Sequence, residues 1–211
     1  MSNATKKEVL SLWSGLGYNS RALRLYETSK ILSKKSFNSI YPNFDVLPGV
    51  GKYTKSALLS FAYEEKVIAQ DTNVIRIFSR FFGIENPQNF IEKNEKNILK
   101  NIKSRKFNQI LMDFGSKICT SRNPLCTECV LEANCKKFFS NTKYTPVPFK
   151  GSNREIRGKI IKFLVVNEGV EISSLKKSLK LEDYKIEPII KKLADEGMIN
   201  IKNKKLIEIS S

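Results

Sequence analysis

The residues best suited to bind a metal in this chain are its four cysteines, which all lie within the stretch CTSRNPLCTECVLEANC, residues 119–135. They are Cys119, Cys126, Cys129 and Cys135. Because a reducing cell interior keeps thiols free, so tight a cluster predicts metal ligands rather than disulfides. Four thiolates suit zinc or an iron–sulfur cluster, and the presence of a single close Cys-x-x-Cys pair favours iron–sulfur. Buried cysteines without a ligand are the alternative.

A second candidate for chemistry is Asp71, which directly precedes the stretch TNVIRIFSRFF. The spacing of Val74, Ile75 and Phe78 predicts a helix with one buried face. An aspartate just before a helix is typical of an N-cap, where its carboxylate accepts hydrogen bonds from the first free N–H groups. A carboxylate fixed at that point can also stabilise positive charge that develops on a sugar. The residues alone leave both interpretations open.

The stretch LPGVGKYTKSALLSFAYEE, residues 47–65, contains the third feature. Pro48, Gly49 and Gly51 predict a tight turn, and apolar periodicity predicts a helix after it. Upstream, SFNSIYPNFDVL has a short segment of helical character, so the whole predicts a helix, a glycine hairpin and a helix. Glycines let the backbone approach a ligand, and the free N–H groups of the second helix suit an anion such as a DNA phosphate. The alternative is a plain connection between helices.

The charge of the chain indicates a polyanionic partner. Lys and Arg number 37 against 21 Asp and Glu, which gives a net charge of +16, and there is no histidine. Such an excess favours nucleic acid binding. A hydrophobic fraction of 41% is sufficient for packed cores. The sequence contains neither a long apolar run nor a signal-peptide pattern, so we expect a soluble, cytoplasmic protein without membrane association.

The residues after the polar, proline-containing stretch FFSNTKYTPVPFKGSN predict a separate small domain. Three amphipathic helices are indicated by Ile156, Ile160, Phe163 and Leu164, by Leu175 and Leu179, and by Ile189, Ile190, Leu193 and Met198, with Pro188 near the first turn of the third. INIKNKKLIEI alternates as a hairpin around Asn203 and Lys204. This is a winged-helix pattern. It binds DNA through the third helix and the wing, with Lys191, Lys192, Lys202, Lys204 and Lys205 available, or it binds a protein partner.

Taken together, LPGVGKYT, DTNVIRIFSR, FNQILMDFGSKICT and the cysteine spacing resemble the helix-hairpin-helix base-excision DNA glycosylases that hold a 4Fe-4S cluster. With LWSGLGYNSRALRL added, the resemblance is to the adenine glycosylases of the MutY type more than to endonuclease III. It covers residues 8 to about 138. It implies a mainly helical fold, with a helix-hairpin-helix glycosylase core at 1–118 and an iron-sulfur loop at 119–138. A linker at 139–153 and the winged helix at 154–211 complete the expected division.

The resemblance also implies roles for individual residues. The four cysteines match the ligands of the 4Fe-4S cluster. Gly49 and Gly51 match a hairpin that binds a DNA phosphate through backbone N–H groups, together with a monovalent cation, and Lys52 lies beside them. Asp71 matches the catalytic aspartate that stabilises an oxocarbenium-like sugar. Tyr53 stands where bifunctional members have a Schiff-base lysine, so a monofunctional enzyme is expected.

Three further residues are expected to contact DNA. Tyr18 matches a tyrosine that adenine glycosylases wedge into the duplex, and Arg21 and Arg24 near it are expected to bind phosphates. An ordinary packed aromatic residue and a solvated basic face are the alternatives for these positions.

The implied function is removal of adenine mispaired with guanine or 8-oxoguanine in double-stranded DNA, by a monomer. In the family, helices that carry a general-acid glutamate precede the point where this sequence starts, so that acid is expected to be missing. Two alternatives therefore stay open. One is a thymine or uracil mismatch glycosylase, and the other is a non-catalytic DNA-binding iron-sulfur protein.

Overall fold

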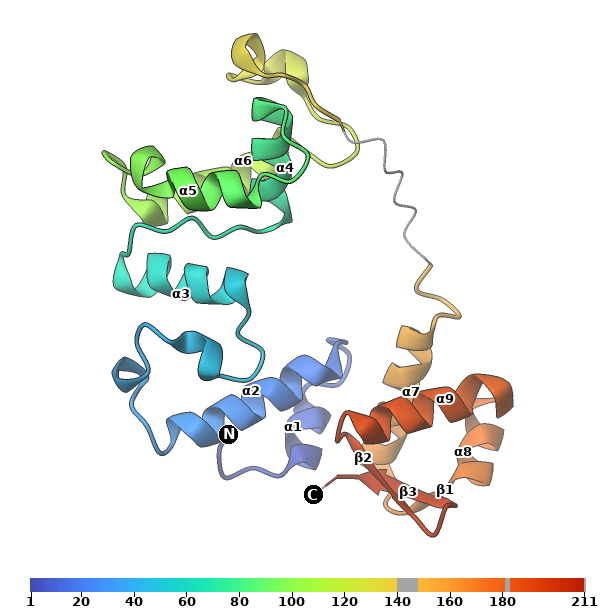
Figure 1. Cartoon of the computed structure of the whole chain (residues 1–211). Coiled ribbons are helices and arrows are strands. Elements are labelled where there is room, and N and C mark those ends of the chain that lie inside the picture. The colour runs from blue at the N-terminus through green and yellow to red at the C-terminus, as the bar shows by residue number, and fades with distance from the viewer. Residues whose placement is uncertain (140–147, 181–182, 211) are drawn as a thin grey trace. The chain divides into compact units, whose positions relative to one another are not determined.

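The computed structural model describes residues 1–139, 148–180 and 183–210, with the backbone alone for 183–185. Contacts divide the chain into two compact units (Figure 1). The first unit comprises Met1–Ser39 and Tyr144–Ser211, and the second comprises Ile40–Lys143. The expected division, with a core at 1–118, a cysteine loop at 119–138 and a C-terminal domain at 154–211, stays a prediction. Most of the predicted linker, residues 139–153, lies outside the described residues.

The first unit joins the two ends of the chain through one apolar core. Its helices are α1 (Lys6–Leu12), α2 (Asn19–Leu32), α7 (Asn153–Val166), α8 (Ile172–Leu179) and α9 (Asp183–Asp195), with a 3-10 turn, η1, at Phe37–Ser39. Leu10 of α1 and Ala22 of α2 are buried in the same cluster as Ile160, Leu164 and Leu193. Burial of this shared apolar surface explains why the N-terminal helices group with the C-terminal ones.

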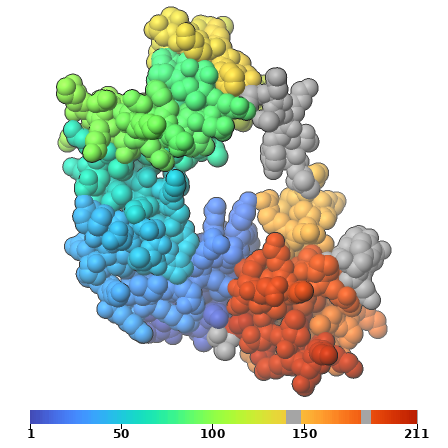
Figure 2. All heavy atoms as spheres, in the orientation of Figure 1, coloured from blue at the N-terminus to red at the C-terminus, as the bar shows by residue number. Residues whose placement is uncertain are grey.

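A three-stranded antiparallel sheet completes the first unit. The strands are β1 (Val170–Glu171), β2 (Ile199–Lys202) and β3 (Leu206–Ile209), in the order β1-β3-β2. Asn203 and Lys204 have φ of 50° and 56°, as a tight hairpin turn requires, so the predicted hairpin is confirmed. Figure 2 shows the segments of this C-terminal part as one continuous packed body. Two details differ from expectation: β1 was not anticipated, and Pro188 lies inside α9 rather than near its first turn.

The second unit is helical and contains Asp71, the glycine hairpin and the four cysteines. Its α-helices are α3 (Lys52–Tyr63), α4 (Thr72–Phe82), α5 (Gln88–Ile98) and α6 (Ser104–Lys117), and its 3-10 turns are η2 (Phe44–Val46), η3 (Cys126–Glu128) and η4 (Glu132–Asn134). A small apolar cluster between α4, α5 and α6 includes Val74, Phe78 and Ile91. The mainly helical fold is thus confirmed. The segment expected to form the first helix of the glycine hairpin contains only the two 3-10 turns η1 and η2.

Candidate active site and cysteine loop

Asp71 is the N-cap of α4, and both of its carboxylate oxygens are engaged. Oδ1 accepts a hydrogen bond from the backbone N–H of Val74 at 2.7 Å. Oδ2 accepts one from the side-chain amide of Asn73 at 3.0 Å. Two such bonds fix the orientation of this partly buried carboxylate. The capping interpretation of Asp71 is confirmed, and the cap holds the carboxylate in one defined position.

The buried side chain of Asn108 holds the segment that leads to Asp71 through hydrogen bonds to its backbone. Its amide oxygen accepts the N–H of Ala69 at 2.9 Å, and its amide nitrogen donates to the carbonyl of Val67 at 2.9 Å. The same nitrogen donates to Ser60 Oγ of α3 at 2.8 Å. Ser104 adds a bond from its hydroxyl to the Val67 carbonyl at 2.6 Å. Asn108 therefore connects α6, the hairpin helix α3 and the approach to Asp71.

Asn73 also connects Asp71 to the start of the cysteine loop. Its side-chain oxygen accepts a hydrogen bond from Arg76 Nη2 at 2.7 Å. Arg76 donates further to the carbonyl of Gly115 at 2.7 Å and, through Nε, to the carbonyl of Cys119 at 2.9 Å. Burial, with the nearby charge of Arg80, lowers the pKa of the Arg76 guanidinium below its usual value. Even so, arginine stays charged at physiological pH.

Gly115 allows α4 and α6 to approach closely at this point. A Cβ at residue 115 would lie 2.6 Å from the Cβ of Asn73. Ordinary carbon contacts are near 3.5–4.0 Å, so any side chain here would displace Asn73. The position of Asn73, and through it that of Asp71, thus depends on a glycine in the neighbouring helix.

Arg80 anchors the first part of the cysteine loop. The residue is only 8% exposed. Its guanidinium donates to the carbonyls of Thr120 at 2.6 Å and Ser121 at 2.9 Å, and it lies 4.7 Å from the centre of the Phe139 ring. Nη1 is also 3.4 Å from Cys119 Sγ. Sequence reasoning missed this residue, although its place three positions after buried Ile77 was an available signal.

The four cysteines line one pocket together with Arg80, Leu125 and Phe139. All four are free thiols and partly buried. In the part of the chain that the structure describes, no three His, Cys, Asp or Glu side chains converge closely enough for a single metal ion. An iron-sulfur cube spreads its thiolate ligands farther apart than one zinc ion, which binds sulfur at about 2.3 Å. The four thiols in one pocket are a donor set that suits an iron-sulfur cluster or zinc.

The glycine hairpin leaves the start of α3 accessible. Gly49 has φ of 84°, a left-handed conformation that favours glycine. Gly51 is the N-cap of α3, and no side chain caps this helix start. Lys52 pairs with Glu92 at 3.6 Å, and Tyr53 in the first turn is 43% exposed. Exposed N–H groups at such a helix start suit an anion.

The remaining predicted DNA contacts belong to the first unit. Tyr18 is half exposed and has φ of 52° at the start of α2. The Arg21 guanidinium lies 4.9 Å from the centre of its ring, whereas Arg24 is exposed on α2. Trp13 supports the preceding loop by donating its indole N–H to the carbonyl of Gly17 at 2.8 Å.

A helical unit with an aspartate-capped helix, a glycine hairpin and a four-cysteine loop fits the DNA-repair glycosylase fold that the resemblance implied. Residues 1–103 match the HhH-GPD superfamily of base excision DNA repair proteins. This match agrees with the resemblance seen in the sequence motifs.

Two curated proteins are similar to the chain in sequence. It is 39% identical, over 67% of its length, to the adenine DNA glycosylase of Buchnera aphidicola subsp. Baizongia pistaciae, covering 42% of that protein. It is 35% identical, over 94% of its length, to the adenine DNA glycosylase of the Acyrthosiphon pisum subspecies, covering 59% of it. The chain thus spans about half the length of these relatives.

A solved structure of a thermostable thymine-DNA glycosylase matches with a TM-score of 0.58 and 29% identity, covering 65% of this chain and 67% of that one.

Among the described residues, no helix is long and apolar enough to cross a membrane.

Proposed function

We propose that the chain is a monofunctional DNA N-glycosylase that removes adenine mispaired with guanine or 8-oxoguanine in double-stranded DNA. The observation that carries this proposal is the carboxylate of Asp71, held through both oxygens at the start of α4. The curated relatives named adenine DNA glycosylases support adenine as the base.

In the proposed reaction, water adds to the anomeric carbon of the deoxyribose while the bond to adenine breaks. The products are free adenine and an abasic site, so one water is consumed for each base released. As the bond breaks, positive charge develops on the sugar. The fixed negative charge of Asp71 stabilises this developing charge without having to reorganise. Such preorganised electrostatic stabilisation is usually the largest single term in catalysis. Asn73 positions that carboxylate through the bond to Oδ2.

The absence of an amine at residue 53 supports a monofunctional reaction. Tyr53 lies in the first turn of α3 and offers a phenol, which cannot form an imine with the sugar. Lys52, one residue earlier, is 94% exposed at its side chain and pairs with Glu92 of α5. We expect hydrolysis without cleavage of the DNA strand.

The proposal also assigns roles to the glycine hairpin and to the cysteine loop. Gly49 and Gly51 bind a phosphate through backbone N–H groups, with a monovalent cation at the hairpin. A 4Fe-4S cluster, held by Cys119, Cys126, Cys129 and Cys135, fixes the loop that follows α6. When bound, such a cluster is a structural and redox-capable group. The shared cysteine pocket and the anchoring of the loop by Arg80 support this assignment.

Binding requires that the target base leave the stack, which costs a few kcal/mol and needs a firm grip on the backbone. Tyr18 wedges into the duplex, and Arg21 and Arg24 contact phosphates. The C-terminal helices and hairpin form a winged helix that contacts DNA or a protein partner. Of its lysines, Lys202 pairs with Glu208 at 2.6 Å, whereas Lys191 and Lys192 are exposed on α9.

The proposal is tested by base release under single-turnover conditions, with anaerobically purified protein in excess over labelled duplex. The duplexes carry adenine opposite 8-oxoguanine, adenine opposite guanine, thymine opposite guanine and uracil opposite guanine. We expect release from the two adenine duplexes alone and strand cleavage only after alkali. Release of thymine or uracil would identify the other mismatch class, and tight binding without release of any base would mean a non-catalytic protein.

A further inference from the structure

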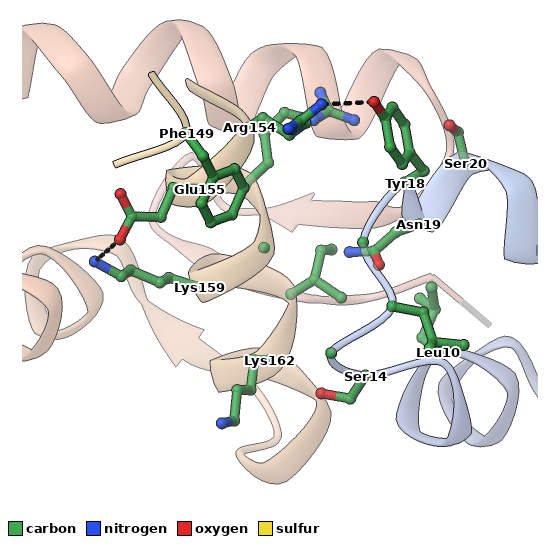
Figure 3. A pocket seen from close by; sticks show the side chains of 16 residues that line it. Leu10, Ser14, Tyr18, Asn19, Ser20, Phe149, Arg154, Glu155, Lys159 and Lys162 are labelled. Atoms are coloured by element: carbon green, nitrogen blue, oxygen red, sulfur yellow. Dashed lines mark hydrogen bonds and ion pairs between the residues drawn. The ribbon is translucent and has the colours of Figure 1, made fainter. Parts of the chain in front are cut away.

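A groove of about 600 Å³ lies within the first unit, between the loop before α2 and residues 154–162 of α7 (Figure 3). One wall is formed by the loop Ser14–Asn19 and the other by α7. Gly15 and Gly17 in the loop have φ of 93° and 71°, and nothing would lie within 4 Å of a Cβ at either position. The loop wall is therefore open backbone that a ligand can approach closely.

The α7 wall is rich in positive charge. Arg154 and Lys162 are exposed, and no acidic partner of Lys162 occurs among the described residues. Arg157 pairs with Glu196 through one nitrogen, while its Nη1 is buried without a hydrogen-bond partner in the described structure. A buried donor of this kind is costly unless an acceptor satisfies it.

The acidic residue of the groove is already neutralised. Glu155 pairs with Lys159 at 2.8 Å and accepts the N–H of Gly151 at 2.5 Å. These contacts lower the pKa of the Glu155 carboxyl, so it stays charged and bound to its partners. The net charge that the groove offers to a ligand is positive.

Arg154 connects this wall to Tyr18. Its guanidinium donates a hydrogen bond to the Tyr18 hydroxyl at 2.5 Å and lies 5.0 Å from the centre of that ring. Figure 3 shows the two side chains pointing toward each other at the edge of the groove. Phe149 places a second ring 5.2 Å from the same guanidinium. Cations stacked on aromatic rings are typical of surfaces that bind bases and phosphates together.

We propose that this groove is a DNA-backbone site, in which Arg154 and Lys162 of α7 bind phosphates of the duplex segment that Tyr18 contacts. The inference deepens the proposed function and rests on it for the role of Tyr18. It assigns DNA contacts to the first helix of the C-terminal part, whereas a winged helix is expected to use its third helix and wing.

The spacing of the charges favours a polyanion over a single small anion. Arg154 and Lys162 are eight residues apart, which corresponds to about 12 Å along an α-helix. One phosphate cannot reach both, but successive phosphates of a duplex can, because the duplex carries a charge about every 1.7 Å of its axis. The overall charge of +16 points to the same partner.

The test is the salt dependence of duplex binding, measured by fluorescence anisotropy on the full chain. An Asp71→Asn background prevents excision during the measurement. The groove variants are Arg154→Gln, Lys162→Gln and the double variant, and Lys177→Gln on α8 is the matched control. The rival surface is represented by Lys191→Gln with Lys192→Gln. Each lost phosphate contact lowers the slope of log K against log salt by about 1.

We expect slopes lower by about 1 for each single groove variant and by about 2 for the double variant, with no change for the control. Unchanged slopes in the groove variants would overturn the proposal, whether or not the α9 variant changes. Lys162 does not contact Tyr18. If Arg154→Gln disturbs the fold, the slope measured for Lys162→Gln alone therefore decides the test. Adenine release by the unmodified chain is measured separately, so a failed glycosylase assay and a failed groove are distinguishable.

Discussion

The two units are held together by different kinds of interaction. In the first unit the described core is almost wholly apolar, with Ile160, Leu164, Leu193 and their neighbours buried together. In the second unit the apolar cluster is smaller, and the buried residues include Ser60, Arg80, Ser104 and Asn108. Every one of these four makes hydrogen bonds that hold either the approach to Asp71 or the start of the cysteine loop.

This difference has a physical consequence. An apolar core tolerates exchange of one apolar side chain for another, because the hydrophobic effect is not directional. A buried hydrogen-bonded side chain fixes atoms in defined positions, and loss of one partner leaves the others unpaired. We therefore expect substitutions of the buried polar residues in the second unit to lower both activity and stability, and substitutions in the apolar core of the first unit to lower stability alone.

The largest effect is expected for Arg80→Met. The change leaves the carbonyls of Thr120 and Ser121 without their buried donor, so unfolding should become easier by about 3–5 kcal/mol. The protein should also retain less iron after anaerobic purification. Urea unfolding and iron analysis measure the two effects. Arg122→Gln, an exposed arginine of the same loop, is the control. Equal behaviour of the two variants would contradict the anchoring role.

Asn108→Leu should cost about 2–4 kcal/mol, because the Ala69 N–H loses its acceptor and the Val67 carbonyl keeps only Ser104 as a donor. Leu164→Ala in the first unit should cost a comparable amount through the cavity it creates. Single-turnover excision, measured at a temperature where both variants stay folded, separates them. The Asn108 variant should be slower at saturating enzyme, and the Leu164 variant should match the unmodified chain. Equal rates would show that Asn108 is purely structural.

Gly115→Ala should destabilise by about 1–3 kcal/mol, because its Cβ overlaps that of Asn73. The matched change is Gly158→Ala inside α7, where nothing lies within 4 Å of the new Cβ. That variant should instead gain about 0.5–1 kcal/mol from helix propensity. Thermal melting of both proteins gives the signs directly. A neutral Gly115→Ala would refute the close approach of α4 and α6.

The smallest effect is expected at the surface pair of Lys7 and Glu168 in the first unit, 2.5 Å apart. Lys7 lowers the pKa of the Glu168 carboxyl below its usual value. The contribution of a carboxyl with a lowered pKa is present above the pKa of the unfolded chain and is lost as pH falls through the folded value. Glu168→Gln should thus lower the melting temperature slightly at pH 7 and less at lower pH. A large effect that salt does not screen would contradict a surface role.

Sequence patterns predicted the parts of the molecule that local rules govern. The N-cap at Asp71 and the Asn203–Lys204 hairpin follow from neighbouring residues, so they could be recognised in advance. The division into units could not, because it depends on apolar side chains of α1 and α2 meeting helices more than a hundred residues away.

The supporting residues of the site were also beyond sequence reasoning. Asn108 and Gly115 stand in the stretch FNQILMDFGSKICT, which carried part of the family resemblance without a role for either residue. Their importance appears only where α6 meets α3 and α4 in space. Arg80 received no role from the sequence, because the hydrogen-bond partners that bury it come from a loop about 40 residues later.

The most direct test of the account is adenine release by Asp71→Asn beside the unmodified chain, on a duplex with adenine opposite 8-oxoguanine. Asparagine keeps an oxygen that can cap α4 but has no negative charge, so folding and duplex binding should be retained. We expect single-turnover release to fall by about 10²–10³-fold or more. Release at an undiminished rate would show that the capped carboxylate is not the group that stabilises the sugar.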